Sequence, residues 1–388
     1  MNEGLSNGGS RSCYWTPLRL LVAVALVAGT FGIITYFIVQ AGAWRSIGYV
    51  GAAMRATKPS PVPRSTSRHS TTRPSEARSP LDQFNLENLT VSKDEIHRGA
   101  AKDAIPSLTM PVTTAVENAE FLGPQERVIG VTVNGESRAY PVSILTYHEA
   151  INDKLGGVPI AVIYCPLCDS ASVVDRRLGD ETYEFAISGL LQNSNVLMYD
   201  RTDRALWSQV ALKSISGPNA GQSLNHLNSW QLTVFYMWRR QKPDSTVVTF
   251  DTGHNRSYRL NPYLSYFWND QLMFPASPTD TRFRNKEPVI GVKLDEIVRA
   301  YPIVTVIEAE NGIVRDTIGG APIELHVSPQ AASIAISQAP DEAQVVYTFW
   351  FAWAAFHPGT DVFGQDAGTE GTDVPESTVE PAATGDEE

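Results

Sequence analysis

The spacing of apolar residues first sets apart the N-terminal region. Residues 18–40 form an almost unbroken apolar run, LRLLVAVALVAGTFGIITYFIVQ, in which Arg19 is the only charged side chain. At about 1.5 Å per residue, a helix of this length crosses a bilayer core of about 30 Å. The run is longer than the roughly 7 to 15 apolar residues of a cleavable signal. It predicts one transmembrane signal-anchor at residues 18–40, behind a cytoplasmic tail at residues 1–17.

Two polar segments flank the part of the chain that can bury a core. Residues 41–80 are expected to be a disordered stalk, because 15 of the 25 residues at positions 56–80 are Ser, Thr or Pro. Residues 365–388 carry eight acidic and no basic side chains, which predicts a disordered acidic tail. The globular body is therefore predicted at residues 81–364. Because a short N-terminal tail normally stays in the cytoplasm, the body is expected outside it.

The body contains an internal repeat. Residues 128–141, VIGVTVNGESRAYP, match residues 289–302, VIGVKLDEIVRAYP, at eight of 14 positions. A Gly-Gly-x-Pro-Ile motif at residues 156–160 likewise returns at residues 319–323. Such self-similarity indicates duplicated structural units. The predicted fold class is a sheet-rich α+β body of two diverged repeats packed together, at about residues 128–250 and 289–364.

The same pattern predicts the local elements. The apolar alternation on both sides of Asn134-Gly135 predicts a β-hairpin. Apolar positions 144, 147, 148 and 151 share one helical face, which predicts a helix that the glycine pair at 156–157 ends. Residues 158–164 form a continuous apolar run and predict a buried strand. Thr233 and Thr348 are expected to cap short aromatic helices.

The two repeats differ where chemistry is expected. Tyr164-Cys165-Pro166-Leu167-Cys168 follows the buried strand of the first repeat, whereas the matching stretch of the second has no cysteine. The second repeat is also shorter by 46 residues, in the region that holds residues 190–209 in the first. This extra segment predicts a hairpin that turns near Asp200, with Trp207 or Gln209 close to the cysteines. The first repeat is therefore expected to be the working half.

These motifs resemble a widespread, mostly prokaryotic family known as domain of unknown function 3179. The resemblance covers roughly residues 83–363. Its carriers are His148-Glu149, the Tyr-Cys-Pro-Leu-Cys segment, and the short motifs at residues 188–191, 199–201, 206–209 and 261–263. Asn261 stands where the family more commonly has Asp. The resemblance implies kinship and carries no activity with it.

The cysteine pair allows three chemistries. Two thiols separated by two residues can form a structural pair, carry out thiol–disulfide exchange, or bind a transition metal such as Zn or Cu. Pro166 favours a tight turn that places both sulfurs on one side. His148 is expected to approach them, which would give a tentative three-ligand metal set of Cys165, Cys168 and His148. Asp169, His254, water or substrate would fill the fourth position, the open arrangement expected of a reactive centre.

The remaining candidates have ordinary structural interpretations as well. Asp200 lies in a sequence typical of a turn, where its carboxylate can accept backbone N–H groups. Trp207 and Gln209 fall on one face of a strand, and a tryptophan there is usually part of the core. The candidate site is thus Cys165 and Cys168 with His148, Asp169, Asp200, Trp207 and Gln209.

Charge excludes one class of partner. The formal net charge of −11 disfavours nucleic-acid binding, which needs clustered Lys and Arg. Two function classes remain: a membrane-anchored extracytoplasmic protein centred on a Cys-Pro-Leu-Cys metal or redox site, with enzymatic activity open, or a non-catalytic envelope-associated module in which the cysteines are structural and an aromatic groove holds a ligand.

Overall fold

The computed structural model describes residues 79–309, 312–328 and 333–365. The predicted cytoplasmic tail, signal-anchor, most of the stalk and the acidic tail lie outside these residues. Within them, no helix is both long enough and apolar enough to cross a membrane. The described body is α+β and sheet-rich, as predicted.

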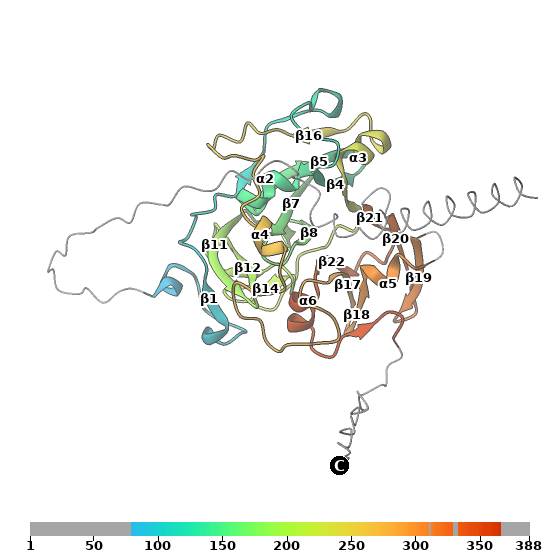
Figure 1. The fold of residues 1–388 in the computed structure, drawn as a ribbon. Helices are drawn as coiled ribbons and strands as arrows, with labels where there is room; N and C mark the ends of the chain where they lie inside the picture. Colours follow the sequence, from blue (N-terminus) through green and yellow to red (C-terminus); the bar gives the residue numbers. More distant parts are fainter. Residues whose placement is uncertain (1–78, 310–311, 329–332, 366–388) are drawn as a thin grey trace, which may run out of the picture.

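Two eight-stranded sheets form the framework of the body (Figure 1). The strands of the first sheet, in spatial order, are β19 (Ile313–Ile318), β20 (Ala321–Ser328), β21 (Ser333–Gln338), β15 (Trp230–Val234), β4 (Arg127–Val133), β5 (Glu136–Pro141), β16 (Thr246–Val248) and β3 (Thr113–Ala115). The strands of the second are β2 (Leu108–Thr109), β6 (Ala150–Leu155), β7 (Val158–Cys165), β8 (Ser170–Asp175), β22 (Gln344–Phe349), β17 (Pro288–Leu294), β18 (Ile297–Pro302) and β23 (Asp361–Val362).

The two sheets have corresponding strand orders. In the first, β15 pairs antiparallel with β4 and β16 runs parallel to β5. In the second, β22 pairs antiparallel with β17 and β23 runs parallel to β18. The three-stranded meander β6-β7-β8 joins the second sheet at β22, and the meander β19-β20-β21 joins the first at β15. Each sheet therefore combines strands from both halves of the body.

A third, five-stranded sheet combines strand β1, near the start of the described residues, with four strands at residues 185–214. Its order is β1 (Ile96–Arg98), β11 (Phe185–Gln192), β12 (Asn195–Asp200), β13 (Leu206–Ser208) and β14 (Lys213–Ser214). Strands β9 (Arg177–Leu178) and β10 (Glu181–Thr182) form a separate small hairpin. The β12–β13 hairpin turns at residues 200–205, where the sequence predicts the turn.

The helices are short, and α3 and α6 pack against interior strands of the two large sheets. They are α2 (Val142–His148), α3 (Phe235–Gln241), α4 (Leu264–Phe267), α5 (Ile303–Val306) and α6 (Trp350–Phe356), with 3₁₀ turns η1 (Pro80–Gln83), η2 (Lys93–Glu95) and η3 (Val116–Asn118). Helices α3 and α6 each bury a tryptophan against a glycine of the facing strand. A Cβ atom at Gly130 would lie 2.1 Å from the Trp238 ring, and one at Gly291 would lie 2.2 Å from the Trp353 ring. These glycines are required by close packing.

Two local predictions are wrong. Helix α2 ends at His148 because Glu149 adopts a left-handed conformation, with φ of 57°, and residues 150–155 form strand β6. The glycine pair at 156–157 turns the β6–β7 hairpin instead of ending the helix. Thr233 and Thr348 lie inside strands β15 and β22, and helices α3 and α6 begin without a side-chain cap.

The main hydrophobic core draws on both large sheets. It includes Ile129 of β4, Val162 of β7, Ile290 of β17 and Leu325 of β20. A second apolar cluster contains Cys165 and Cys168 and extends to Phe185 and Trp207 of the five-stranded sheet. The cysteine turn therefore lies where the second large sheet meets the extra segment of the first half.

Candidate functional site

The Cys-Pro-Leu-Cys turn joins strands β7 and β8. Strand β7 ends at Cys165 and β8 begins at Ser170, and the backbone N–H of Cys168 donates to the carbonyl of Cys165. The two sulfurs lie 4.0 Å apart, as free thiols, and both cysteines are buried. The turn thus holds a dithiol with its sulfurs on the same side, as the position of Pro166 predicts.

The pKa values of the two thiols are shifted in opposite directions. Burial opposes ionisation of Cys165, but hydrogen bonds from the Cys168 thiol and from the backbone N–H groups of Cys168, Val196 and Leu167 outweigh it and lower its pKa. Burial raises the pKa of Cys168 well above its usual range, and the hydrogen bond and negative charge of Cys165 reinforce this shift. Of the two thiols, Cys165 is therefore the one that ionises more readily.

A buried carboxyl group lies beside the dithiol. Glu149 directly follows helix α2 and is 6% exposed, and its side chain has no hydrogen-bond partner among the described residues. Burial raises the pKa of Glu149 well above its usual range, and the negative charge of Cys165 raises it further. Burial also raises the pKa of Tyr263, with Glu149 and Cys165 adding to the effect. Its surroundings beside Cys165 therefore favour the neutral form of the Glu149 carboxyl group.

The sequence interpretation singled out His148 and passed over Glu149. The signal was present, because Glu149 belongs to the same His-Glu motif. What the sequence did not show is the left-handed backbone at Glu149, which sends the two side chains to different places.

An amide and hydroxyl network connects the dithiol to the extra segment of the first half. Asn195 Nδ2 lies 3.6 Å from Cys168 Sγ and donates to Gln209 Oε1 at 2.8 Å. The Ser170 hydroxyl also donates to Gln209 Oε1, at 2.6 Å. Gln209 thus contacts the residues that surround Cys168. The structure adds Asn195, which the sequence interpretation missed.

Trp207 packs in the same apolar cluster as the two cysteines. Its ring makes an edge contact with Phe185, with ring centroids 5.5 Å apart, and a tilted contact with Tyr183. The residue is 2% exposed, and its indole N–H has no hydrogen-bond partner in the described part of the chain. Trp207 is therefore part of the apolar packing around the two cysteines.

Asp169 does not face the sulfurs as a ligand. Its carboxylate forms a bidentate ion pair with Arg127, with N–O distances of 2.9 and 3.2 Å. The hydroxyls of Tyr164 and Tyr347 donate to the same carboxylate, at 2.7 and 3.2 Å. This buried cluster ties β4 and β22 to the end of the cysteine turn. The expectation that Asp169 supplies a fourth metal ligand is wrong, because both of its oxygens are already engaged.

His148 is likewise engaged elsewhere. Its Nδ1 lies 2.7 Å from the carbonyl of Pro106, and its Nε2 lies 2.7 Å from the hydroxyl of Tyr258. Burial lowers the pKa of His148 to about 4, so the ring is neutral at neutral pH. A carbonyl can only accept, so Nδ1 carries the proton and Nε2 accepts from Tyr258.

The expected three-ligand metal set does not form. Both ring nitrogens of His148 are occupied, and the part of the chain that the structure describes contains no group of three or more His, Cys, Asp or Glu side chains placed to hold a metal ion. His254 is exposed, and its ring makes a tilted contact with that of His148, with centroids 5.2 Å apart.

Asp200 serves the β12–β13 turn. Its carboxylate accepts the backbone N–H groups of Thr202, Asp203 and Glu184. Burial raises its pKa, and these bonds oppose the shift. The bonds from Thr202 and Asp203 fit the turn interpretation, and the bond from Glu184 joins the turn to the start of strand β11.

Comparison with known proteins places the chain in a family. The family model described as "Protein of unknown function (DUF3179)" matches residues 102–348, more than half of the chain. The chain belongs to the DUF3179 family. No curated protein and no solved structure matches the chain.

The dithiol of this DUF3179 domain lies beneath residues 263–276, which we call the cover segment. The hydroxyl of Tyr266 donates to the carbonyl of Leu167, between the two cysteines, at 2.9 Å. The ammonium group of Lys286 donates to three cover carbonyls, those of Tyr266, Asn269 and Gln271, at 2.6 to 2.8 Å. One buried lysine therefore fastens the cover segment over the cysteine turn.

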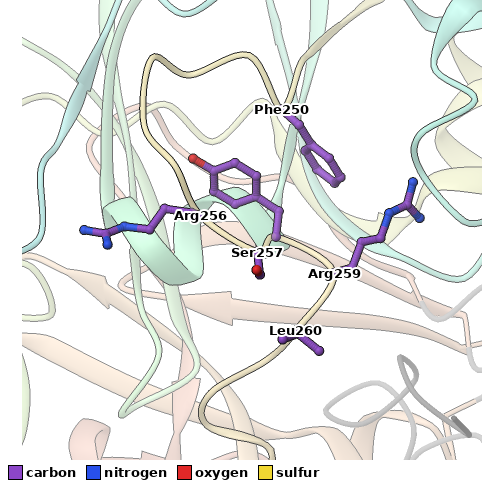
Figure 2. Close-up of a pocket in the computed structure, with 6 residues that line it drawn as sticks. Phe250, Arg256, Ser257, Arg259 and Leu260 are labelled. Carbon is purple, nitrogen blue, oxygen red and sulfur yellow. The ribbon is translucent and has the colours of Figure 1, made fainter.

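The DUF3179 domain also has an open cavity of about 360 Å³ (Figure 2). Phe250, Arg256, Ser257, Tyr258, Arg259 and Leu260 line it. Tyr258 is the residue whose hydroxyl contacts His148. The guanidinium groups of Arg256 and Arg259 extend to opposite sides of the cavity (Figure 2).

Proposed function

We propose that this protein is a membrane-anchored, extracytoplasmic thiol–disulfide redox protein whose reactive group is the Cys165–Cys168 dithiol. The observation that carries the proposal is the buried pair of free thiols with sulfurs 4.0 Å apart, in which the pKa of Cys165 is lowered and those of Cys168 and the neighbouring Glu149 are raised. A nucleophilic thiolate, a resolving thiol and a proton donor are the groups that such exchange requires.

The proposed reaction begins when the Cys165 thiolate attacks one sulfur of a substrate disulfide. A bond forms between Cys165 and that sulfur, the substrate S–S bond breaks, and the second substrate sulfur leaves as a thiolate. Glu149 gives its proton to this leaving thiolate. The substrate disulfide is the oxidant and is reduced.

The second step closes the protein disulfide. The Glu149 carboxylate takes the proton from Cys168, whose thiolate attacks the sulfur of Cys165. The Cys165–Cys168 bond forms, the mixed disulfide breaks, and the remaining substrate sulfur leaves as a thiolate that takes a proton from water. Two electrons pass from the dithiol to the substrate, and Glu149 ends protonated as it began.

Polar groups around the sulfurs favour this function over a purely structural cysteine pair. A structural pair needs only an apolar shell, whereas Cys168 lies within 3.6 Å of Asn195 Nδ2 and Cys165 lies next to a carboxyl group. Burying an uncompensated carboxyl group costs free energy, so its presence indicates a chemical role.

We further propose that the body consists of two diverged repeats that exchange strands. Support comes from the corresponding strand orders of the two large sheets and from matching buried clusters. Asp153 accepts from Arg138 and Tyr140, and Asp316 accepts from Arg299 and Tyr301 at corresponding positions. The redox dithiol then occurs in one repeat, and the other supplies Tyr347 and the partner strand β22.

The membrane location rests on the apolar run at residues 18–40. We propose that it anchors the protein with the body outside the cytoplasm, a compartment in which disulfides form and persist. A reporter active only in the cytoplasm, fused to the C-terminus, should give no signal. A strong signal would reverse the orientation.

The redox proposal is tested on the full-length chain in detergent, in a Cys13→Ser background so that only two thiols remain. In thiol–disulfide buffers the protein should convert reversibly between a form with two alkylatable thiols and a form with none. Cys165→Ser should abolish the conversion. Glu149→Gln should slow exchange at least tenfold while the oxidised form remains attainable.

Three results would overturn the proposal. One is a wild-type protein whose thiols stay reduced in every buffer while the fold is intact. Another is disulfide formation that occurs only after denaturation, which would make the pair structural. The third is stoichiometric retention of a metal ion by the reduced protein.

A further inference from the structure

We propose that the cavity bordered by Arg256, Tyr258 and Arg259 is a binding site for a small organic dianion, such as a molecule with two carboxylate groups or with a phosphate group. This site is separate from the dithiol and does not depend on the proposed redox function.

The cavity is positively charged within an acidic protein. Residues 250–260 contain three basic side chains, His254, Arg256 and Arg259, and one acidic side chain, Asp251. Arg256 and Arg259 are exposed and form no salt bridge with the described residues. In contrast, Arg127, Arg138 and Arg299 each pair with a carboxylate. Two unpaired guanidinium groups at a concave surface favour an anionic ligand.

The arrangement of the two cations favours a ligand with two charges. The two guanidinium groups extend in opposite directions, the ring of Phe250 lies between them in this view, and Leu260 lies to one side (Figure 2). A ligand with an apolar middle and two anionic ends matches this order. The cavity volume of about 360 Å³ suits a small molecule.

Tyr258 lines the cavity, and hydrogen bonds hold its side chain in place. The residue is 5% exposed, and its hydroxyl lies between Thr252 and His148. Because Nδ1 of His148 must donate to Pro106, the Tyr258 hydroxyl donates to Nε2 and accepts from Thr252. This series of hydrogen bonds fixes the orientation of the Tyr258 side chain in the absence of ligand. The positive charge of Arg256 lowers the pKa values of His148 and Tyr258, so Arg256 interacts electrostatically with these hydrogen-bonded residues.

The test is isothermal titration calorimetry of the full-length chain in neutral detergent, with succinate, inorganic phosphate and acetate as probes. Succinate or phosphate should bind saturably, and acetate at least tenfold more weakly, because it can pair with one cation only. Arg256→Gln and Arg259→Gln should each weaken succinate or phosphate binding at least tenfold, a loss of one charge-assisted contact. Arg239→Gln, an exposed arginine outside the cavity, is the matched control.

A spectroscopic measurement separates this site from anion binding elsewhere on the chain. The bound ligand should shift the ¹⁵N resonance of His148 Nε2, and Tyr258→Phe should remove that shift while circular dichroism shows an intact fold. Absence of saturable binding by both succinate and phosphate would overturn the proposal. So would binding that both arginine variants retain, or acetate binding as tight as succinate.

Discussion

His148 and Glu149 are consecutive in the chain, yet their side chains belong to different polar clusters. His148 is bonded to Pro106 and Tyr258, whereas Glu149 lies beside the Cys165 thiol. The cause is the left-handed conformation of Glu149, with φ of 57°, which ends helix α2 and turns the chain into strand β6. The left-handed backbone at Glu149 therefore places a carboxyl group beside the dithiol and a neutral imidazole against Tyr258.

The raised pKa of Glu149 predicts a distinct dependence of stability on pH. Above about pH 4.5 the unfolded chain loses the Glu149 proton, whereas the folded protein keeps it until its higher pKa is reached. In this window the free energy of unfolding falls as pH rises, by about 1.4 kcal/mol per pH unit for one proton. Glu149→Gln keeps a neutral side chain and should remove this slope.

Chemical denaturation of both proteins between about pH 5 and 8 measures the effect. The contribution of His148 cancels in the comparison, because both proteins retain that residue. Parallel stability curves for the two proteins would show that Glu149 is ionised in the folded state.

The His148 ring should titrate near pH 4 as the tautomer protonated at Nδ1. Tyr258→Phe removes the hydroxyl that donates to Nε2 of the neutral ring, so it should raise the pKa of His148, by about one unit. Two-dimensional ¹H–¹⁵N spectra of the ring report both tautomer and titration. Tyr147→Phe is the control, because the Tyr147 hydroxyl bonds the carbonyl of Leu260 and leaves His148 untouched.

A titration of His148 near pH 6.5 in the folded wild type would contradict the assigned hydrogen bonds. The sign for stability is opposite to that of Glu149. Between about pH 6.5 and pH 4 the unfolded chain binds a proton at His148 that the folded protein does not, so acidification lowers stability.

Gly130→Ala should destabilise the body by about 1 to 3 kcal/mol, because its Cβ would overlap the Trp238 ring. Gly291→Ala should have a similar effect through Trp353. Thermal unfolding of each variant is compared with that of Gly123→Ala, where the added Cβ would meet nothing nearer than 3.6 Å. Equal melting temperatures for all three variants would mean that the tryptophans do not pack as described.

Lys286→Met should expose the dithiol. Removing the ammonium group breaks three hydrogen bonds to the cover segment, and each bond from a charged donor contributes about 1.5 to 3 kcal/mol. Alkylation of Cys165 under native conditions should therefore become at least tenfold faster. The exposed Lys154 provides a control as Lys154→Met, which should alkylate at the wild-type rate. An unchanged rate of Cys165 alkylation in Lys286→Met would mean that the reagent does not reach the dithiol through the cover segment.

Part of the candidate site could be predicted because it depends on short-range pattern. The cysteine turn follows from Pro166 between a buried strand and a polar segment, and the β12–β13 hairpin follows from two apolar runs on either side of Asp200. The carboxylate of Asp169 could not be assigned, since its partners Arg127 and Tyr347 are 42 and 178 residues away in the chain. Spacing along a sequence says nothing about such distant pairs.

Short-range pattern was enough to predict the sheet-rich class, the hairpin at residues 128–141 with its repeat at 289–302, and one cysteine turn, because apolar alternation, the turn at Asn134-Gly135 and proline act over a few residues. Long-range packing set the rest: each large sheet takes strands from both halves, Glu149 and not His148 lies near Cys165, and Lys286 holds the cover segment. These outcomes depend on one left-handed residue and on contacts between distant segments. Their free energy is gained only when the whole body is packed.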